Sequence, residues 1–176
     1  MLIRQRSTLW TLASSMLAMF AACADSGSVD GRIAAKSEQC EATYNVVGSR
    51  PVQLLNQQYS GIPGQMFTVV RSSRDWASIW LKICRMCAEP PPGDVDFNRD
   101  MLIVGALGEH SGAYMSSVDG VKLVGGQLEI VILEYVAGPQ CLITTANMQP
   151  VSVARVPKSI CPPRFRPVAE EHNCQV

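Results

Sequence analysis

Seven cysteines and two histidines are the side chains of this 176-residue chain with the clearest capacity for chemistry. An odd number of cysteines leaves one thiol over when the others form disulfides. Cys84 and Cys87 form a C-x-x-C pair, a spacing that occurs in disulfides, redox centres and zinc sites. The chemistry therefore depends first on which cysteines pair and which one has another fate.

Cys23 differs from the other six cysteines because it follows a segment typical of export. Residues 1–8 carry two arginines and no acid, and residues 9–22 carry no charge. A basic start, a short apolar core and small residues at a cleavage site are typical of a bacterial secretory signal. The apolar run is shorter than the roughly 20 residues that a membrane span needs. We expect residues 1–22 to be a signal peptide.

Two cleavage patterns overlap at the end of this segment. Ala21-Ala22-Cys23 resembles a bacterial lipobox, in which Cys23 becomes the lipidated first residue, whereas Ala22-Cys23-Ala24 fits ordinary signal cleavage. Lipidation of Cys23 also explains the odd cysteine count. Residues 23–39, rich in small and polar residues, then form a lipid anchor and flexible tether. The sequence predicts a protein of the bacterial cell envelope, lipid-anchored or secreted, with a single domain over residues 40–176.

The remaining six cysteines are expected to form up to three disulfides in an oxidising compartment. We predict Cys40–Cys174, which would tie the ends of the domain together, Cys141–Cys161 and Cys84–Cys87. The last pair lies near the C-terminal end of a predicted helix, where the helix dipole disfavours a thiolate. A structural disulfide is therefore the favoured interpretation of that pair, with redox chemistry and metal binding as alternatives.

One loop contains a histidine beside an acid and a hydroxyl, and it runs through Gly108, Glu109, His110, Ser111, Gly112, Ala113 and Tyr114. Neighbouring side chains in a loop do not normally face one another, and the chain has no G-x-S-x-G elbow. His172 lies in a polar tail. We therefore predict no catalytic residues, no cofactor and no metal, and we interpret the loop as a candidate contact with a partner protein.

The elements that position this loop follow from hydrophobic periodicity. Trp76, Ile79, Trp80 and Ile83 share one helical face, Ser72 and Asp75 form a capping-box pattern, and prolines follow, which together predict a helix over 73–86. Strands are expected over 66–70, 101–107, 114–118, 121–124, 127–135, 142–146 and 151–156, with Asp119-Gly120 as a hairpin turn. The predicted fold class is mainly β (α+β), a small antiparallel β-sandwich or barrel-like domain with one amphipathic helix.

Composition excludes two classes of protein. The chain carries 15 basic and 15 acidic residues, so it lacks the basic footprint of a nucleic-acid-binding protein. Its apolar fraction of 47% argues against a disordered protein.

A series of short motifs between about residues 60 and 160 has an order and spacing of its own. These motifs are Asp75-Trp76, Ile79-Trp80, Val95-Asp96-Phe97, Met101-Leu102-Ile103-Val104, Leu107-Gly108, Ser111-Gly112-Ala113-Tyr114, Gln149-Pro150-Val151 and Arg155-Val156-Pro157. The ordered set resembles the PrcB C-terminal domain family, named for a subunit of a bacterial surface protease complex. This resemblance implies a secreted or lipid-anchored, non-catalytic domain, which in one family member stabilises a protease assembly. We therefore expect a domain for protein–protein interaction, with stabilisation or assembly of a partner subunit as its role.

The chain departs from that family at several points. The family usually has Gly-Gly-Tyr where this chain has Gly112-Ala113-Tyr114, and the Cys84/Cys87 pair with its following prolines is also different. The loop before Tyr114 is also similar, more distantly, to the loop of chagasin-type inhibitors of cysteine proteases. A protease inhibitor acting through that loop is therefore the alternative function.

Overall fold

The structure of the chain is a computed structural model that describes residues 40, 50–84, 91, 94–111, 113–141 and 147–173, without the side chains of Ala113 and Tyr114. The predicted signal peptide, Cys23 and the tether to residue 39 lie outside the described residues. So do Cys87, Gly112, Cys174 and the predicted strand 142–146. Within the described part of the chain, no helix is long and apolar enough to span a membrane.

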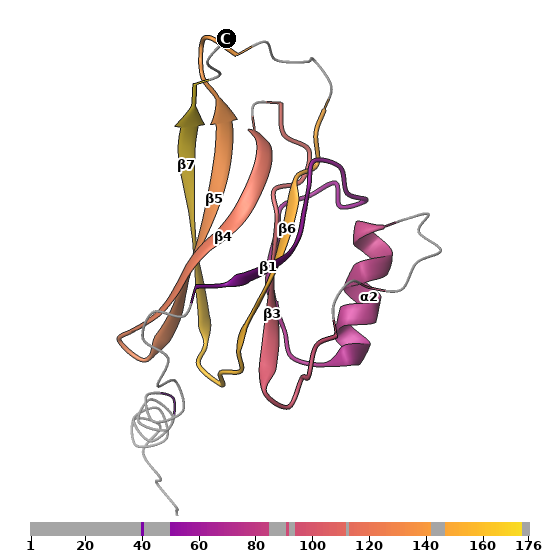
Figure 1. The fold of residues 1–176 in the computed structure, drawn as a ribbon, viewed down its shortest axis with the longest axis vertical. Coiled ribbons are helices and arrows are strands. Elements are labelled where there is room, and N and C mark those ends of the chain that lie inside the picture. Colours follow the sequence, from indigo (N-terminus) through magenta and orange to yellow (C-terminus); the bar gives the residue numbers. More distant parts are fainter. Residues whose placement is uncertain are drawn as a thin grey trace, which may run out of the picture.

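A four-stranded antiparallel sheet forms the middle layer of the molecule (Figure 1). Its strands, in spatial order, are β1 (Val52–Gln57), β6 (Val151–Pro157), β3 (Asp100–Ala106) and β2 (Met66–Val70). The central strand β3 is buried from Met101 to Ala106, as its continuous apolar sequence predicts. Because both faces of β3 are covered, this sheet has a layer on each side.

A three-stranded sheet covers one face of the first. It contains β4 (Ala113–Val124), β5 (Gln127–Ala137) and β7 (Pro163–His172), in that spatial order. Gly125 and Gly126 close the hairpin between β4 and β5 with positive φ angles of 56° and 72°. β7 then pairs with β5 in parallel. The predicted mainly β sandwich is confirmed, with one parallel pair within an otherwise antiparallel fold.

The predicted hairpin at Asp119-Gly120 is wrong, because β4 continues through it as one strand. The register of β4 against β5 shifts between Val118 and Gly120, so the Asp-Gly pair forms an irregularity within the strand. A turn here would give up the pairing of β4 with β5, which extends on both sides from Ala113 to Val124. Pairing over the whole strand therefore overrides the local turn preference.

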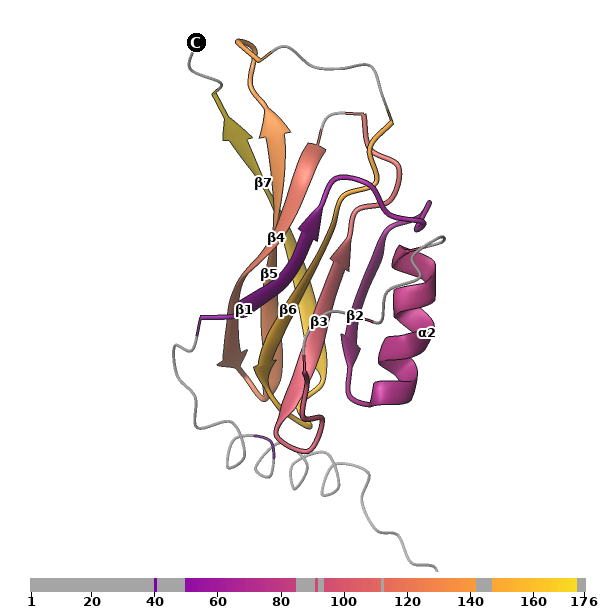
Figure 2. The same cartoon turned by 45° about the vertical axis from the view of Figure 1, so that its right-hand side comes forward.

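The helix α2 (Ser73–Ile83) covers the other face of the four-stranded sheet (Figure 2). Ser72 caps it: the Ser72 hydroxyl accepts from the Asp75 backbone N–H at 3.1 Å and donates to the Asp75 carboxylate at 2.7 Å. The helix ends at Ile83, where the Cys84 N–H bonds to the Trp80 carbonyl at 2.8 Å. The predicted helix is confirmed, and its end lies three residues before the predicted one.

Two hydrophobic clusters result from this layering. Met101 and Ile103 of β3 face the three-stranded sheet, where they pack with Leu128, Ile130 and Ile132. Leu102 and Val104 of the same strand face α2, where they pack with Trp76 and Ile83. Alternate residues of β3 thus join both clusters, which explains why its sequence shows no alternation of apolar and polar residues.

The disulfide between Cys40 and Cys161 spans 121 residues and is buried in the cluster between the sheets. The predicted pairs Cys40–Cys174 and Cys141–Cys161 are therefore wrong. Cys161 precedes the start of β7, whereas Cys141 follows the end of β5, where its sulfur lies 3.2 Å from the His172 carbonyl oxygen. Because β5 and β7 run parallel for ten residue pairs, these two cysteines lie at opposite ends of the three-stranded sheet.

Two further cysteines are disulfide-bonded. They are Cys84 and Cys141, and their partner sulfurs lie outside the described residues. Cys84 follows directly on α2, so a bond there fixes the C-terminal end of the helix. Its pairing with Cys87 stays a prediction.

Candidate functional site

Three loops meet at one end of the four-stranded sheet, where β1 and β3 end and where β2 and β6 begin (Figure 2). They are residues 58–65, 107–111 and 147–150, and we call them the rim. The loop 107–111 is the described part of the contact loop expected from the sequence. Antiparallel pairing of the four strands is what brings the three loops to the same end.

Backbone hydrogen bonds link the three loops of the rim to one another. The Glu109 N–H donates to the Pro63 carbonyl at 3.0 Å, which joins the second loop to the first. The His110 N–H donates to the Met148 carbonyl at 2.9 Å, which joins the second loop to the third. The Gln149 N–H donates to the Gln58 carbonyl at 2.9 Å and closes the ring. The rim is therefore one connected surface.

Gly108 allows the loops to approach so closely. Its φ is 76°, a conformation that side-chain-bearing residues rarely adopt. A β carbon here would lie 2.8 Å from the Gln65 nitrogen and 2.9 Å from the Pro63 oxygen. The absence of a side chain at this position thus lets the Leu107-Gly108 segment contact the backbone of the first loop.

The polar side chains of the predicted loop take part in these links. The Glu109 carboxylate accepts from the Gln149 side-chain amide at 3.3 Å, which joins the second and third loops a further time. His110 forms an isolated β-bridge with Met148. Ser111 is exposed, and Gly112 and the side chains of Ala113 and Tyr114 lie outside the description. The loop's histidine and acid therefore hold positions in a hydrogen-bonded framework.

The exposed groups of the rim are mostly neutral. Tyr59, with 57% of its surface exposed, is its large exposed aromatic residue, and Glu109 is its only acidic residue. The other exposed residues are Gln58, Pro63, Gly64, Gln65, Ser111 and Asn147. Tyrosine, serine, glycine and asparagine are the residues that adaptable protein-binding loops favour, because they offer contact area and hydrogen bonds at a low cost in conformational entropy.

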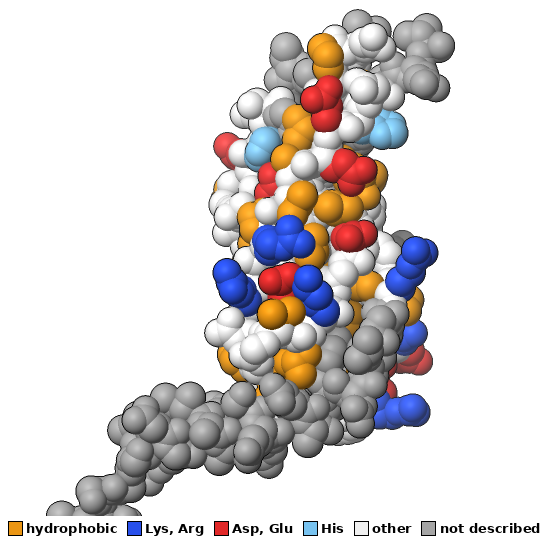
Figure 3. Space-filling model, turned by 90° about the vertical axis from the view of Figure 1, so that its left-hand side faces the viewer, with side chains coloured by type: hydrophobic (Ala, Val, Ile, Leu, Met, Phe, Trp, Pro, Cys, Tyr) orange, Lys and Arg blue, Asp and Glu red, His pale blue; other side chains and the backbone are white. Residues whose placement is uncertain are grey.

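A second polar surface lies on the outer face of the three-stranded sheet, where Figure 3 shows cationic and acidic side chains gathered. The Glu129 carboxylate lies 3.1 Å from Lys122 Nζ and 3.7 Å from Arg166 Nε. The hydrogen bond from Lys122, together with the charges of Lys122, Arg166 and Arg164, lowers the pKa of Glu129 below its ordinary value against an opposing desolvation. These ion pairs join all three strands across one face.

The residues of the PrcB resemblance fall on several elements of the fold. Asp75-Trp76 lies in α2, Met101 to Val104 in β3, and Leu107-Gly108 in the rim. Comparison of the chain with protein-family models, with curated proteins and with solved structures finds no match.

The sequence identified only one of the loops that form the rim. The other two carry Pro63-Gly64 and Gln149-Pro150, which predict turns and not contacts. Their meeting depends on strand pairing between residues far apart in sequence. A local pattern could show that three turns exist, but not that they share one end of a sheet.

Proposed function

We propose that this chain is an exported, non-catalytic domain that binds a partner protein through the rim. The single observation that carries the proposal is the ring of backbone hydrogen bonds among the three loops. Loops held in one conformation on a rigid β scaffold are well suited to recognition, because binding then orders little additional chain.

Tyr59 supports this role as the centre of the contact. A tyrosine offers a large amphipathic surface with few rotatable bonds, and such residues dominate binding energy at protein interfaces. Its exposure of 57% leaves this surface accessible. Neutral polar residues surround it on the rim, so contact with a partner does not require the burial of many unpaired charges.

The polar groups of the rim favour binding over catalysis. The Glu109 carboxylate bonds to Gln149, and the backbone at His110 bonds to Met148, so these residues contribute to the shape of the loops. These bonds support a fixed surface for recognition.

The setting that we propose is the bacterial cell envelope. The buried disulfide and the two further disulfide-bonded cysteines suit an oxidising compartment. Lipidation at Cys23 would tether the domain to a membrane. The resemblance to the PrcB C-terminal domain family makes a subunit of a surface protease complex the first partner to test.

Mild crosslinking of the full chain in its own host, followed by purification and mass spectrometry, tests this proposal. We expect one partner protein to be recovered with the wild type and to fall at least about tenfold with Tyr59→Ala, since a central aromatic contact contributes about 2 kcal/mol or more. Val124→Ala, exposed at 47% and at the end of β4 that lies farthest from the rim, is the matched control. Equal recovery with both variants would reject the rim as the binding surface.

An inhibitor would behave differently. A chagasin-like protein would inhibit papain-like proteases in a purified assay, and its inhibition would be lost with changes in the loop before Tyr114. That result would show that the rim inhibits a protease and does not assemble a partner complex.

A further inference from the structure

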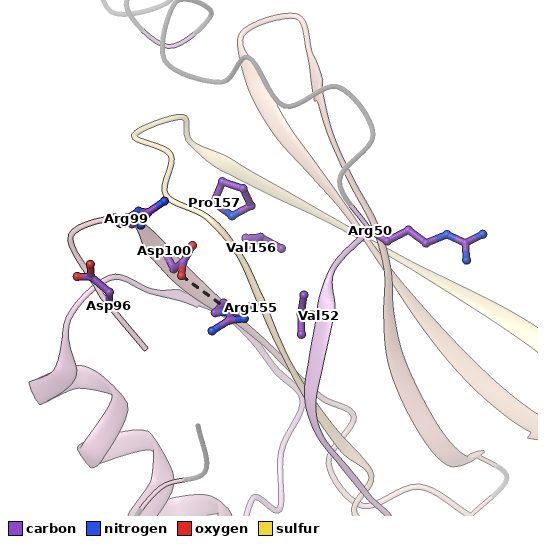
Figure 4. Close-up of a pocket in the computed structure, with 8 residues that line it drawn as sticks. All are labelled: Arg50, Val52, Asp96, Arg99, Asp100, Arg155, Val156 and Pro157. Carbon is purple, nitrogen blue, oxygen red and sulfur yellow. Dashed lines mark ion pairs between the residues drawn. The ribbon is translucent and has the colours of Figure 1, made fainter. Parts of the chain in front are cut away.

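A hollow of about 400 Å³ lies at the end of the four-stranded sheet opposite the rim. It is bounded where β1 and β3 begin and β6 ends (Figure 4). Its lining contains three arginines, two aspartates and three apolar residues: Arg50, Arg99, Arg155, Asp96, Asp100, Val52, Val156 and Pro157. Arginine is over-represented where carboxylates are recognised, because its planar guanidinium bonds both oxygens at once.

We propose that this hollow binds a carboxylate that is attached to an apolar body. Arg50 extends away from the hollow and Arg155 faces the Asp100 carboxylate, so Arg99 supplies the positive charge that one negative charge on a ligand can match. A dianion such as phosphate would bring a second negative charge close to the two aspartates. The carboxylate is therefore the oxyanion that fits the charge of the lining.

Arg99 is the first residue expected to hold the ligand. It is exposed, and within the described residues its side chain forms no hydrogen bond or ion pair. Its backbone is fixed, because its N–H donates to the Asp96 carbonyl at 2.9 Å and its carbonyl accepts from the Lys158 N–H at 2.8 Å. An anchored backbone with an uncommitted guanidinium can bind an anion without breaking an existing bond.

Arg155 is the second residue. Its Nε lies 3.9 Å from the Asp100 carboxylate, and its Nη1 lies 3.5 Å from the Asp94 carbonyl oxygen. Both separations are at the long end of a polar contact, so neither uses the full hydrogen-bonding capacity of the guanidinium. Figure 4 shows Arg99, Asp100 and Arg155 around one hollow, whereas Arg50 extends away from them.

The apolar part of the lining indicates which kind of group is attached to the carboxylate of the ligand. Val52, Val156 and Pro157 come from two neighbouring strands. A volume of about 400 Å³ exceeds that of a carboxylate group alone. Val52 is exposed and Pro157 is half-buried, so these two side chains are available to contact the group that carries the carboxylate, whereas the Val156 side chain is buried in the cluster between the sheets. The free end of a peptide with an apolar last residue and a small apolar carboxylic acid share this chemistry.

Titration of the full disulfide-bonded chain, followed by backbone amide NMR, tests the proposal with N-acetyl-leucine and N-acetyl-leucinamide. We expect N-acetyl-leucine to shift the signals of Arg99, Asp100 and Val156, and the amide to shift them at least about tenfold less at equal concentration. This factor corresponds to the loss of a charge-assisted hydrogen-bonded pair. Equal shifts with both compounds, or shifts confined to other parts of the chain, would overturn the proposal.

Arg99→Gln removes one guanidinium and no side-chain hydrogen bond or ion pair among the described residues, so the fold should be kept. We expect its affinity for N-acetyl-leucine to fall on the order of tenfold. Arg74→Gln, an exposed arginine of α2 outside the lining, is the matched control and should bind as the wild type does. Unchanged affinity in Arg99→Gln would overturn the assignment.

A tetrapeptide with a free C-terminal leucine separates the two sources of the carboxylate. Tighter binding of the tetrapeptide than of N-acetyl-leucine assigns the hollow to the end of a protein chain, whereas equal affinities assign it to a small acid. The hollow and the rim lie at opposite ends of the sheet, so a failure of this inference leaves the proposed function of the rim unaffected.

Discussion

A β carbon on Gly108 would lie 2.6 Å from the carbonyl carbon of Gly64. These two glycines mark the point where two loops of the rim touch backbone to backbone. Everything proposed for the rim depends on this contact, because the loops can share a ring of hydrogen bonds only at this separation.

Gly108→Ala is expected to lower the free energy of unfolding by about 2–5 kcal/mol. A left-handed conformation costs an alanine about 1–2 kcal/mol, and overpacking against the fixed backbone of the first loop adds about 1–3 kcal/mol. Urea denaturation measures the change. Gly120→Ala is the matched control, because Gly120 has open space around its β-carbon position, and it should change stability by less than about 1 kcal/mol. Equal effects of the two changes would contradict the described contact.

Replacement of both Cys40 and Cys161 by alanine is expected to cost about 2–5 kcal/mol of stability. The bond joins two cysteines that are 121 residues apart in the sequence. Without it, the unfolded chain gains conformational entropy, and this gain is large because the loop is long. Urea denaturation without reductant is the appropriate measurement, because the remaining disulfides then stay intact. A double variant as stable as the wild type would show that this disulfide does not stabilise the domain.

Stability should depend on the charge of Glu129. Its pKa is lowered in the folded state, first by the hydrogen bond from Lys122, so ionised Glu129 stabilises the fold above the ordinary glutamate pKa. This contribution is lost as the pH falls through the lowered value. Glu129→Gln should therefore be less stable than the wild type at pH 7, and the difference should shrink in acid.

Titration of the Glu129 carboxyl carbon by NMR measures the pKa directly. We expect a value below that of an ordinary glutamate, and a rise toward that value in Lys122→Met. A titration at the ordinary glutamate value in the wild type would contradict the ion-pair geometry.

Two prolines lie on β7, the last strand of the three-stranded sheet. The Leu128 N–H bonds to the Pro162 carbonyl and the Gly138 N–H to the His172 carbonyl, so the even-numbered residues of β7 face β5. Pro163 and Pro167 are odd-numbered and face outward, where they remove two donors from the free edge.

Replacement of both Pro163 and Pro167 by threonine restores these N–H groups. We expect the double variant to form larger species as its concentration rises, because an edge strand with free donors can pair with another chain. Size-exclusion chromatography with light scattering detects them. Ala169→Thr adds a similar side chain at the same edge without a new N–H, so it should elute as the wild type does. Identical behaviour of the two variants would show that the prolines do not protect this edge.

Local patterns predicted the elements that carry their own signal. The spacing of Trp76, Ile79, Trp80 and Ile83 predicted α2, and the apolar run of residues 101–107 predicted β3. β7 was missed because its sequence contains two prolines and several charges, and its strand conformation depends on pairing with β5. The outward position of both prolines is visible only after that pairing is known.

The candidate site, like the fold, could be predicted from the sequence only in part. The loop containing His110 could be identified from its residue types, and its link to Gln149 across 40 residues could not. The arginines of the hollow come from separate segments of the chain, so no short motif contains them. The predicted disulfide Cys141–Cys161 was wrong for a related reason. The parallel pairing of β5 with β7 places these two cysteines at opposite ends of the sheet, and the sequence does not show that pairing.

Site-specific photo-crosslinking in the native host tests the central claim most directly. A photoreactive phenylalanine analogue placed at Tyr59 lies on the rim, and one placed at Val124 lies exposed at the end of β4 farthest from the rim. We predict a discrete crosslinked complex with one partner protein from position 59 and none from position 124. The same complex from both positions, or from position 124 alone, would contradict a partner-binding rim.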